Sequence, residues 1–316
     1  MKHKILVTGK VREGWAEELF SIATVDVWDH EEVYLMPREE LLARVTDCDA
    51  VINFTDVKVD EIFVKNAARL KIVANCAIGY DNLNLPLLTA HKIWATNTPG
   101  YFSYPVAEYV FAGILLMSRR LLEADDFVRN GAWKVLEPGR WDGSSIREKT
   151  IGIVGMGEIG LQLRKMLLDI GAKVIYYAPR QKDVPGAVSF ESLLHDADIV
   201  SVHVPLNHQT EKLFDAGTIK KMKPGSILVN TSRGKVVDSA ALIAALTSGH
   251  LAAAVLDVVE TEPDVPEELR KMKNVLLTPH ISGGTLWSRK ESFRLAAENV
   301  RAALSGMRPP NALNDL

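Results

Sequence analysis

The chain has 316 residues, of which 47% are hydrophobic and 24% are charged, and its formal net charge is −3. This length suggests two domains with sizeable cores, and the small net charge gives no indication of nucleic-acid or anionic-membrane binding. Cys48 and Cys76 are too few for a disulfide scaffold or a metal motif, so we expect no metal and a reducing, cytoplasmic location. The first residues, MKHKILVTGKV, lack the apolar core of a signal peptide.

Residues 1 to 98 alternate short apolar runs with helical patterns, which predicts a parallel sheet covered by helices on both faces. The expected strands are Lys4–Val7, Val25–Trp28, Ala50–Phe54, Lys71–Asn75 and Ile93–Thr96. The expected helices are Gly14–Ile22, Arg38–Thr46 and Val59–Ala68. A turn at 97–100 then precedes one long predicted helix, Ser103 to Arg129, and an irregular segment rich in Gly, Pro and Trp, Gly131–Ser145.

A second alternating pattern restarts at Thr150. Its expected strands are Thr150–Val154, Lys173–Tyr177, Ile199–Val204, Ser226–Asn230, Ala253–Asp257 and Val275–Thr278. The last helix, Leu286 to Leu304, is expected to return to the first domain. The predicted fold is therefore α/β with two Rossmann-like, doubly wound parallel sheets. A cofactor domain, 99–285, is inserted into a flavodoxin-like substrate domain, 1–98 with 286–316, and a ligand cleft is expected at the carboxyl ends of the strands.

A glycine-rich fingerprint, TIGIVGMGEIG, follows the first strand of the second half. Gly155 permits the turn, Gly157 lets the backbone approach a pyrophosphate, and Gly160 lets helix and strand pack closely. The helix N-terminus then offers free N–H groups to phosphates. A packing turn of small residues is the alternative, but the strand before it and the helix after it favour dinucleotide binding. The candidate cofactor contacts here are Gly155, Met156, Gly157, Glu158, Ile159 and Gly160.

Three chemically reactive side chains follow strands of the second half, at the edge where the glycine turn also lies. Arg233 can bind a carboxylate and a carbonyl oxygen through two hydrogen bonds. His280 can donate a proton at neutral pH, and Glu262 can pair with it and orient its ring. Each has an ordinary alternative, as a phosphate contact or cap for Arg233 and a solvated acidic loop for Glu262. Their joint placement favours a shared site for the reduction of a 2-oxo acid.

Several segments in this order resemble the D-isomer-specific 2-hydroxyacid dehydrogenase family over nearly the whole chain, most closely its glyoxylate and hydroxypyruvate reductases. They are GIVGMGEIG, SVHVPLNHQT, ILVNTSRGKVVD, LDVVETEP and LLTPHISGGT. The resemblance implies that Arg233 binds the substrate, Glu262 supports the histidine, and His280 donates the proton. It also implies cofactor contacts at Val204, Pro205, Thr231, Asp257, His280 and Gly283, and substrate contacts at Ala77, Ile78, Gly79, Arg233 and His280.

The second strand of the fingerprint unit ends without the carboxylate that binds the ribose 2′-OH in NAD enzymes. Ala178 occupies that place and Arg180 follows it. A guanidinium binds a 2′-phosphate, so we expect NADP(H) to be preferred, with NAD(H) possible. An exposed loop role for Arg180 is the alternative. Glu158 is unusual because an acid beside the pyrophosphate weakens anion binding unless it points into solvent.

The expected partner is a small 2-oxo or 2-hydroxy acid, without nucleic acid or membrane. A homodimer is expected through the apolar stretch Val106–Leu116, whose alternative role is in the core of its own chain. Two other functions stay open at this point. One is a reductase for bulkier 2-oxo acids, such as 2-ketogluconate or phenylpyruvate, and the other is a non-catalytic, corepressor-like nicotinamide sensor.

Overall fold

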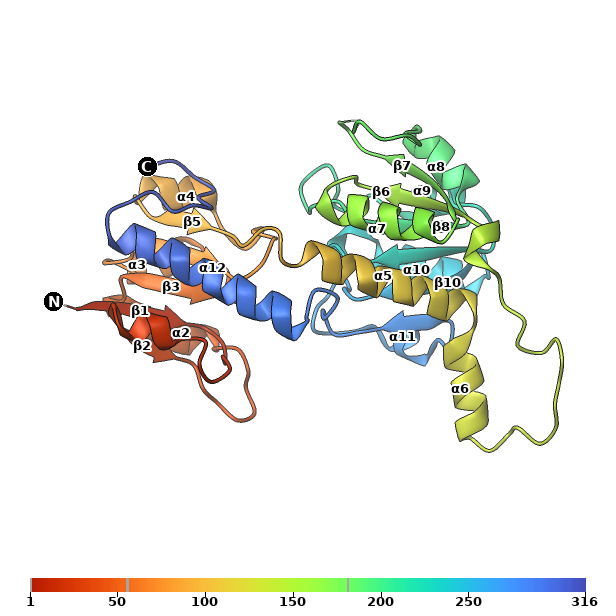
Figure 1. Ribbon diagram of the computed structural model, residues 1–316, viewed down its shortest axis with the longest axis horizontal. Coiled ribbons are helices and arrows are strands. Elements are labelled where there is room, and N and C mark those ends of the chain that lie inside the picture. The colour runs from red at the N-terminus through yellow and green to blue at the C-terminus, as the bar shows by residue number, and fades with distance from the viewer. Residues whose placement is uncertain (1, 55–56, 181) are drawn as a thin grey trace. The chain divides into compact units, whose positions relative to one another are not determined.

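The computed structural model describes residues 2–54, 57–180 and 182–316 (Figure 1). The chain divides into two compact units, one formed by residues 1–102 with 284–316 and the other by residues 103–283. The sequence placed these boundaries at 98/99 and 285/286. Both units are built around a parallel sheet, which confirms the predicted α/β class.

The first unit contains a five-stranded sheet in the order β2-β1-β3-β4-β5, with every strand parallel to its neighbours. This is the flavodoxin-like order, in which the chain changes direction along the sheet between β1 and β3. All residues of β3 and β4 are buried, as expected for central strands covered on both faces. The strands are β1 (His3–Val7), β2 (Ala23–Val27), β3 (Ala50–Asn53), β4 (Ile72–Asn75) and β5 (Trp94–Thr96).

The helices of this unit are shorter than their patterns predicted, except the last. They are α1 (Glu17–Phe20), α2 (Arg38–Arg44) with the 3₁₀ turn η1 (Val45–Asp47), α3 (Glu61–Asn66), α4 (Leu85–Ala90) and α12 (Leu286–Leu304). The sequence reading missed α4, whose first turn contains Pro86 and whose cap Asn84 accepts a hydrogen bond from the N–H of Leu87.

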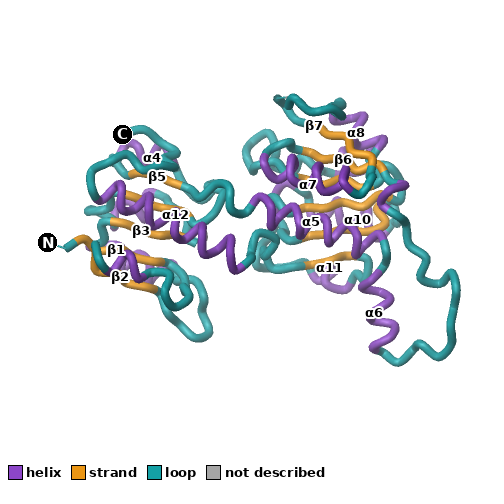
Figure 2. Tube along the Cα trace, in the orientation of Figure 1, coloured by secondary structure: helices purple, strands orange, loops and turns teal. Residues whose placement is uncertain are grey.

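Helix α12 has the predicted bounds and lies on the sheet of the first unit, as Figure 2 shows. Thr285 and Ser288 form a reciprocal capping box that fixes its start. Its buried face, which includes Phe293, Ala296 and Val300, packs with apolar side chains of the first sheet. These sheet residues include Ile5, Ile52 and Ala74. The last helix therefore completes the core of the first unit.

The second unit contains a six-stranded parallel sheet in the order β11-β10-β9-β8-β6-β7. A single parallel bridge joins Tyr176 of β7 to Ala187, at the place where a doubly wound dinucleotide fold has its third strand. The direction changes between β6 and β8, so this is the point where a ligand is expected. The strands are β6 (Thr150–Val154), β7 (Lys173–Tyr177), β8 (Ile199–Val202), β9 (Ser226–Asn230), β10 (Leu251–Leu256) and β11 (Val275–Leu277).

Helices cover both faces of this second sheet (Figure 1). They are α5 (Ser103–Ser118), α6 (Leu121–Arg129), α7 (Glu158–Asp169), α8 (Phe190–Asp196), α9 (Ala216–Lys221), α10 (Ser239–Thr247) and α11 (Glu267–Lys271), with the 3₁₀ turns η2 (Ile146–Glu148) and η3 (Gly234–Val236). None of the helices in the described part of the chain is long and apolar enough to cross a membrane.

The long helix predicted from Ser103 to Arg129 is two helices, and this prediction was wrong. Arg120 adopts a left-handed conformation with φ of 54° between α5 and α6. Its guanidinium pairs with Glu123 and lies over the ring of Trp141. The N–H of Ser144 also donates to the carbonyl of Ser118. The returning loop therefore binds the end of α5 and redirects the chain, an effect that local periodicity does not encode.

The apolar stretch on α5 forms part of the core of its own unit. Val110 and Ile114 are fully buried among side chains of α7 and the sheet. A Cβ at Gly113 would lie 2.8 Å from Val255 on β10, so helix and strand pack closely there. This stretch therefore serves the intrachain role that the sequence left as the alternative to a dimer contact.

Candidate active site

The glycine fingerprint forms a tight turn between β6 and α7. Gly155 has a φ of +99°, and a Cβ there would lie 2.4 Å from the carbonyl oxygen of His203. A Cβ at Gly160 would lie 2.4 Å from the carbonyl of Gly155, so the helix start packs directly on the turn. Gly157 differs, because a Cβ there would meet no atom of the described residues within 4 Å apart from its chain neighbours. The turn therefore leaves open space at the helix N-terminus.

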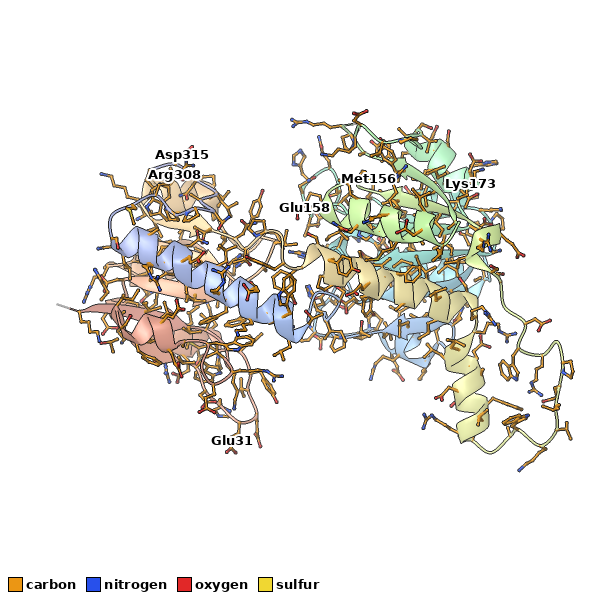
Figure 3. All side chains as sticks on the ribbon, viewed as in Figure 1. Glu31, Met156, Glu158, Lys173, Arg308 and Asp315 are labelled. Carbon is orange, nitrogen blue, oxygen red and sulfur yellow. The ribbon has the colours of Figure 1, made fainter. Side chains whose placement is uncertain are left out.

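Glu158 begins α7, and Gly157 precedes it as the N-cap. Figure 3 labels Glu158 at this end of the second unit, while Lys173 at the start of β7 lies at the opposite end. Oε2 of Glu158 accepts a 2.8 Å hydrogen bond from the hydroxyl of Ser103 at the start of α5. The carboxylate is thus held by Ser103 of α5, and its negative charge interacts favourably with the positive end of the α7 dipole. Met156, also labelled, is buried beneath the turn.

The loop after β7 carries the residues expected to select the cofactor. Ala178 is partly buried, whereas Arg180 and Lys182 are exposed. Tyr176 anchors this loop from below, because its hydroxyl donates to the carbonyl of Lys182 and accepts from the N–H of the same residue. The backbone of Lys182, two residues after Arg180, is therefore anchored at the carboxyl edge of the sheet.

Two buried polar atoms at the same edge have no hydrogen-bond partner among the described residues. They are Nδ1 of His203, just after β8, and Oγ1 of Thr231, just after β9. Nε2 of His203 is bonded to the hydroxyl of Ser201 at 2.8 Å, and burial lowers the pKa of this histidine to about 4. Val204 is buried next to it and Pro205 is exposed. Unpaired buried polar atoms are costly, so they are typical of a site that receives a polar ligand.

Arg233 lies on a turn that the buried side chain of Asn230 holds. The Asn230 amide donates to the carbonyl of Arg233 at 3.0 Å and accepts from both the N–H and the hydroxyl of Ser232. At the next residue, a Cβ on Gly234 would lie only 1.8 Å from the carbonyl oxygen of Val259. The turn that presents Arg233 therefore packs backbone to backbone on the segment that leads to Glu262.

Asp257 directly follows β10 and is buried, and it holds the turn that follows β11. Its Oδ1 accepts from the hydroxyl of Thr278 at 2.6 Å and from the N–H of Ile281 at 2.8 Å. Its Oδ2 accepts from the N–H of Ser282 at 2.7 Å. The hydroxyl of Tyr109 on α5 lies 2.5 Å from Thr278 Oγ1, whose proton goes to the carboxylate, so Tyr109 is the donor. The contacts observed for Asp257 thus fix the position of the 278–282 turn.

His280 sits on this turn with a φ of 53°, a conformation that non-glycine residues rarely adopt. Its N–H donates to the carbonyl of Asp257 at 2.9 Å. Its ring Nδ1 lies 3.0 Å from Oε2 of Glu262, and the side chains remain 51% and 37% exposed. The pair is therefore accessible to a small molecule, and the carboxylate fixes one ring nitrogen so that Nε2 is left to act on a substrate.

Because β9, β10 and β11 are neighbours in the sheet, Arg233, Glu262 and His280 come from the same stretch of its carboxyl edge. The structure brings Glu262 and His280 into direct contact, while Arg233 reaches the same segment through the packing of Gly234. Gly283, also expected at the cofactor, follows the turn that Asp257 holds. The residues Ala77, Ile78 and Gly79 form a partly buried loop after β4 in the first unit.

The residues at the carboxyl edge of the second sheet fit a nicotinamide dinucleotide. Open space at Gly157, the N-terminus of α7, and the unpaired atoms of His203 and Thr231 are what a phosphate-containing polar ligand requires. The carboxylate of Glu158 at the start of α7 opposes the binding of an anion. In the described part of the chain, no cluster of three His, Cys, Asp or Glu residues is placed to hold a metal ion.

Sequence reasoning missed the residues that hold the site. Asn230, Tyr109 and Gly234 act through tertiary contacts. Among these three, Asn230 gave a signal in the sequence, because it is a polar residue at the end of an apolar strand. Asp257, which was predicted as a cofactor contact, directly follows β10.

Comparison with known proteins decides the family. The model of the D-isomer specific 2-hydroxyacid dehydrogenase NAD binding domain matches residues 111–282. The chain belongs to the D-isomer-specific 2-hydroxyacid dehydrogenase family. As such it is an NAD(P)-dependent oxidoreductase. It is similar to the glyoxylate reductases of Thermococcus litoralis and Pyrococcus furiosus, with 41% and 38% identity over 99% of this chain and 97% and 96% of theirs.

Solved structures agree with this family over almost the whole chain. The crystal structure of the TT0316 protein from Thermus thermophilus has a TM-score of 0.93 and 35% identity, covering 98% of this chain and 99% of that one. The NADPH-dependent glyoxylate/hydroxypyruvate reductase from Sinorhizobium meliloti, solved with NADP and malonate, has a TM-score of 0.85 and 28% identity. That comparison covers 99% of this chain and 97% of the other.

Proposed function

We propose that this dehydrogenase reduces glyoxylate or hydroxypyruvate to the corresponding 2-hydroxy acid. The observation that carries the proposal is the exposed His280–Glu262 pair, with its 3.0 Å contact. The two residues lie in the loops after β11 and β10, and β10 is next to β9, the strand that leads to Arg233. The names of the curated relatives support the substrate class.

In this proposal each residue has one task. The guanidinium of Arg233 binds the carboxylate and the carbonyl oxygen of the substrate and polarises the carbonyl. The backbone N–H groups of Ala77, Ile78 and Gly79 bind the carboxylate. His280 donates a proton from Nε2 to the carbonyl oxygen, and Glu262 orients the ring through its contact with Nδ1.

The nicotinamide, when bound, supplies the hydride that adds to the carbonyl carbon. The electron pair of the carbonyl π bond then moves to oxygen, which takes the proton of His280, and the proton is replaced from solvent. The net change is one hydride and one proton added across the C=O bond. Asp257 keeps His280 in place during this transfer through the turn that it binds.

The decisive experiment follows NADPH absorbance at 340 nm with a panel of 2-oxo acids. Glyoxylate and hydroxypyruvate should be reduced, and His280→Ala should lower kcat by roughly 10²–10⁴-fold. Near-normal turnover by His280→Ala would reject the proposed proton donor. A preference for 2-ketogluconate or phenylpyruvate would instead place the enzyme among reductases for bulkier acids, and nicotinamide binding without turnover on any of them would favour a non-catalytic sensor.

We further propose that NADP(H) is preferred over NAD(H). Ala178 provides no carboxylate to repel a 2′-phosphate, and Arg180 and Lys182 are exposed on the loop that Tyr176 anchors. The Sinorhizobium reductase, named NADPH-dependent, is consistent with this preference. The test compares kcat/KM for NADPH and NADH in the wild type, in Arg180→Ala and in Ala178→Asp. Both substitutions should reduce the NADPH preference, and a wild type that favours NADH would reject it.

We also propose that the protein forms a homodimer. The proposed contact surface is not the buried stretch on α5 but lies on α6 and the segment after it. Helix α6 and the irregular segment after it extend from the second unit in Figure 1 and carry exposed apolar side chains. Those residues are Leu121, Val128, Trp133, Val135 and Leu136. A monomer rarely exposes such a group of large apolar residues, so a second copy is the expected cover.

Light scattering at micromolar concentration tests this assembly. The wild type should have twice the 34.9 kDa mass of one chain, and the double substitution Trp133→Asp with Leu136→Asp should return it to a monomer. A wild-type mass of one chain would reject the dimer.

We propose a cytoplasmic location, which the two free, buried cysteines Cys48 and Cys76 support and which cell fractionation would test.

A further inference from the structure

Three consecutive carbonyl groups of the loop after β4 are each bound by a different fixed donor. The N–H of Thr98 donates to the carbonyl of Ala77 at 2.9 Å. Nδ2 of Asn97 donates to the carbonyl of Ile78 at 2.8 Å, and Nδ2 of Asn75 donates to that of Gly79 at 3.3 Å. All three carbonyls are thus held toward the body of the first unit.

The N–H groups of the same loop have no such partners. Within the described residues, no acceptor is bonded to the N–H of Ile78 or of Gly79. A backbone whose carbonyls are bound on one side leaves its N–H groups for another ligand, and successive free N–H groups form a concave site for an anion. The loop is partly buried, so an anion there is partly shielded from water.

Asn75 lies at the centre of a buried amide network that sets the orientation of each member. Its Oδ1 accepts from Asn53 at 3.0 Å and from Asn82 at 3.3 Å. Its Nδ2 donates to Asn82 Oδ1 at 2.7 Å as well as to the carbonyl of Gly79. All the donors and acceptors of this fully buried amide are used, so the side chain has one hydrogen-bonded orientation.

The backbone carbonyl of Val57 fixes the orientation of the other two amides in the network. Asn82 donates to the carbonyl of Val57 at 3.0 Å, and Asn53 donates to the same carbonyl at 3.4 Å. Because a carbonyl only accepts, each of these amides must turn its NH₂ toward Val57 and its oxygen away. The network therefore connects Val57, in the segment after β3, to the loop after β4 through the neutral amides of Asn53, Asn75 and Asn82.

We infer that Asn75 and Asn97 are positioning residues that shape the loop of Ala77, Ile78 and Gly79 into a binding site for the substrate carboxylate. The inference rests on the proposed function and adds to it the side chains that determine the geometry of the N–H groups. A neutral network suits this task, because it fixes the backbone without placing a competing charge beside the anion. Asn75 and Asn97 act through backbone carbonyls and not by touching the substrate.

The test uses the full-length enzyme with oxalate, which has carboxylates but no reducible carbonyl. Asn97→Ala and Asn75→Ala should each weaken oxalate binding and raise KM for glyoxylate by roughly three- to tenfold, the effect of losing one hydrogen bond. The kcat at saturating glyoxylate and the Kd for NADPH should stay within about twofold, since the second unit contains the fingerprint. The Kd for oxalate is measured by calorimetry with NADPH bound.

Asn299→Ala is the matched control. Asn299 is fully buried in the same unit and bonds the carbonyl of Leu295 and the N–H of Asn311, away from the loop. This variant should lower Tm without changing KM for glyoxylate or the Kd for oxalate. If Asn75→Ala does not fold, Asn97→Ala alone tests the inference, because Asn97 is only partly buried.

The outcomes separate the two proposals. The inference would be overturned if the Asn97 and Asn75 variants keep their oxalate affinity and their KM for glyoxylate. It would also be overturned if Asn299→Ala changes both quantities equally, or if the wild type binds no oxalate. A wild type that binds oxalate, loses affinity in both variants, but reduces no glyoxylate would reject the proposed reaction and retain the anion site.

Discussion

The buried carboxylate of Asp257 accepts a 2.7 Å hydrogen bond from the N–H of Ser282, across the turn that carries His280. In Asp257→Asn an amide NH₂ replaces one oxygen, and in either orientation it faces a donor that it cannot bind. We expect a loss of about 1–3 kcal/mol in the free energy of unfolding and at least a tenfold lower kcat, since His280 loses its fixed position.

Urea unfolding and steady-state kinetics check this expectation. Asp215→Asn is the control, because that residue only caps α9 with an exposed side chain. It should leave kcat unchanged. A variant at Asp257 with normal stability and normal kcat would show that the turn needs no such anchor.

Two glycines of the fingerprint, Gly157 and Gly160, should respond differently to substitution by alanine. Gly157 has open space and a negative φ of −81°, so Gly157→Ala should keep its Tm but weaken NADPH binding at least tenfold where its methyl meets the phosphates. Gly160→Ala places a methyl against the carbonyl of Gly155, so its Tm should fall by several degrees. Thermal unfolding without cofactor and NADPH titration distinguish the two. A large fall in Tm for Gly157→Ala would contradict the open space seen there.

Glu158 should limit cofactor affinity. Its carboxylate stands at the N-terminus of α7, where a pyrophosphate is expected, and it is bonded to Ser103. Glu158→Gln should tighten NADPH binding about two- to fivefold at low salt and much less at 0.5 M salt, because ions screen exposed charges. It should also lose the favourable dipole interaction, about 0.3–1 kcal/mol of stability. Unchanged or weaker NADPH binding at low salt would show that the acid does not face the phosphates.

His203 should make stability depend on pH. Burial lowers its pKa from 6.5 to about 4, so the native state keeps the ring neutral while the unfolded chain takes up a proton below pH 6.5. The free energy of unfolding should therefore fall as the pH decreases from 6.5 toward 4 and level off below that. This group contributes at most about 3 kcal/mol to that fall.

Urea unfolding of the wild type and of His203→Asn between pH 7 and pH 4 measures this contribution as a difference. The variant should show a shallower dependence than the wild type. His195→Asn, at a residue whose side chain is 86% exposed, should follow the wild type. Parallel curves for the wild type and His203→Asn would show that this histidine is not the cause.

Local patterns in the sequence determined most of the secondary structure of the second unit. The strands Thr150–Val154, Lys173–Tyr177 and Ser226–Asn230 have their predicted bounds, because apolar runs bounded by turn residues form buried parallel strands. Position also carried information, since a residue that directly follows a parallel strand must lie at the carboxyl edge of the sheet. That rule predicted that His280, and Glu262 five residues beyond Asp257, lie at the same edge of the sheet.

Only the tertiary structure decided what holds those groups in place. The break between α5 and α6 at Arg120 depends on contacts with Trp141 and Ser144. The short helix α4 depends on its cap and on packing, and it has too few apolar residues to be predicted from periodicity. The backbone contact of Gly234 with Val259 joins segments that are not neighbours in the sequence. Propensity and periodicity act over a few residues, whereas hydrogen bonds between loops form only when the sheet brings strand ends together. The sequence thus identifies the single residues that carry the chemistry of this protein, whereas contacts between residues far apart in the sequence set the geometry of the site.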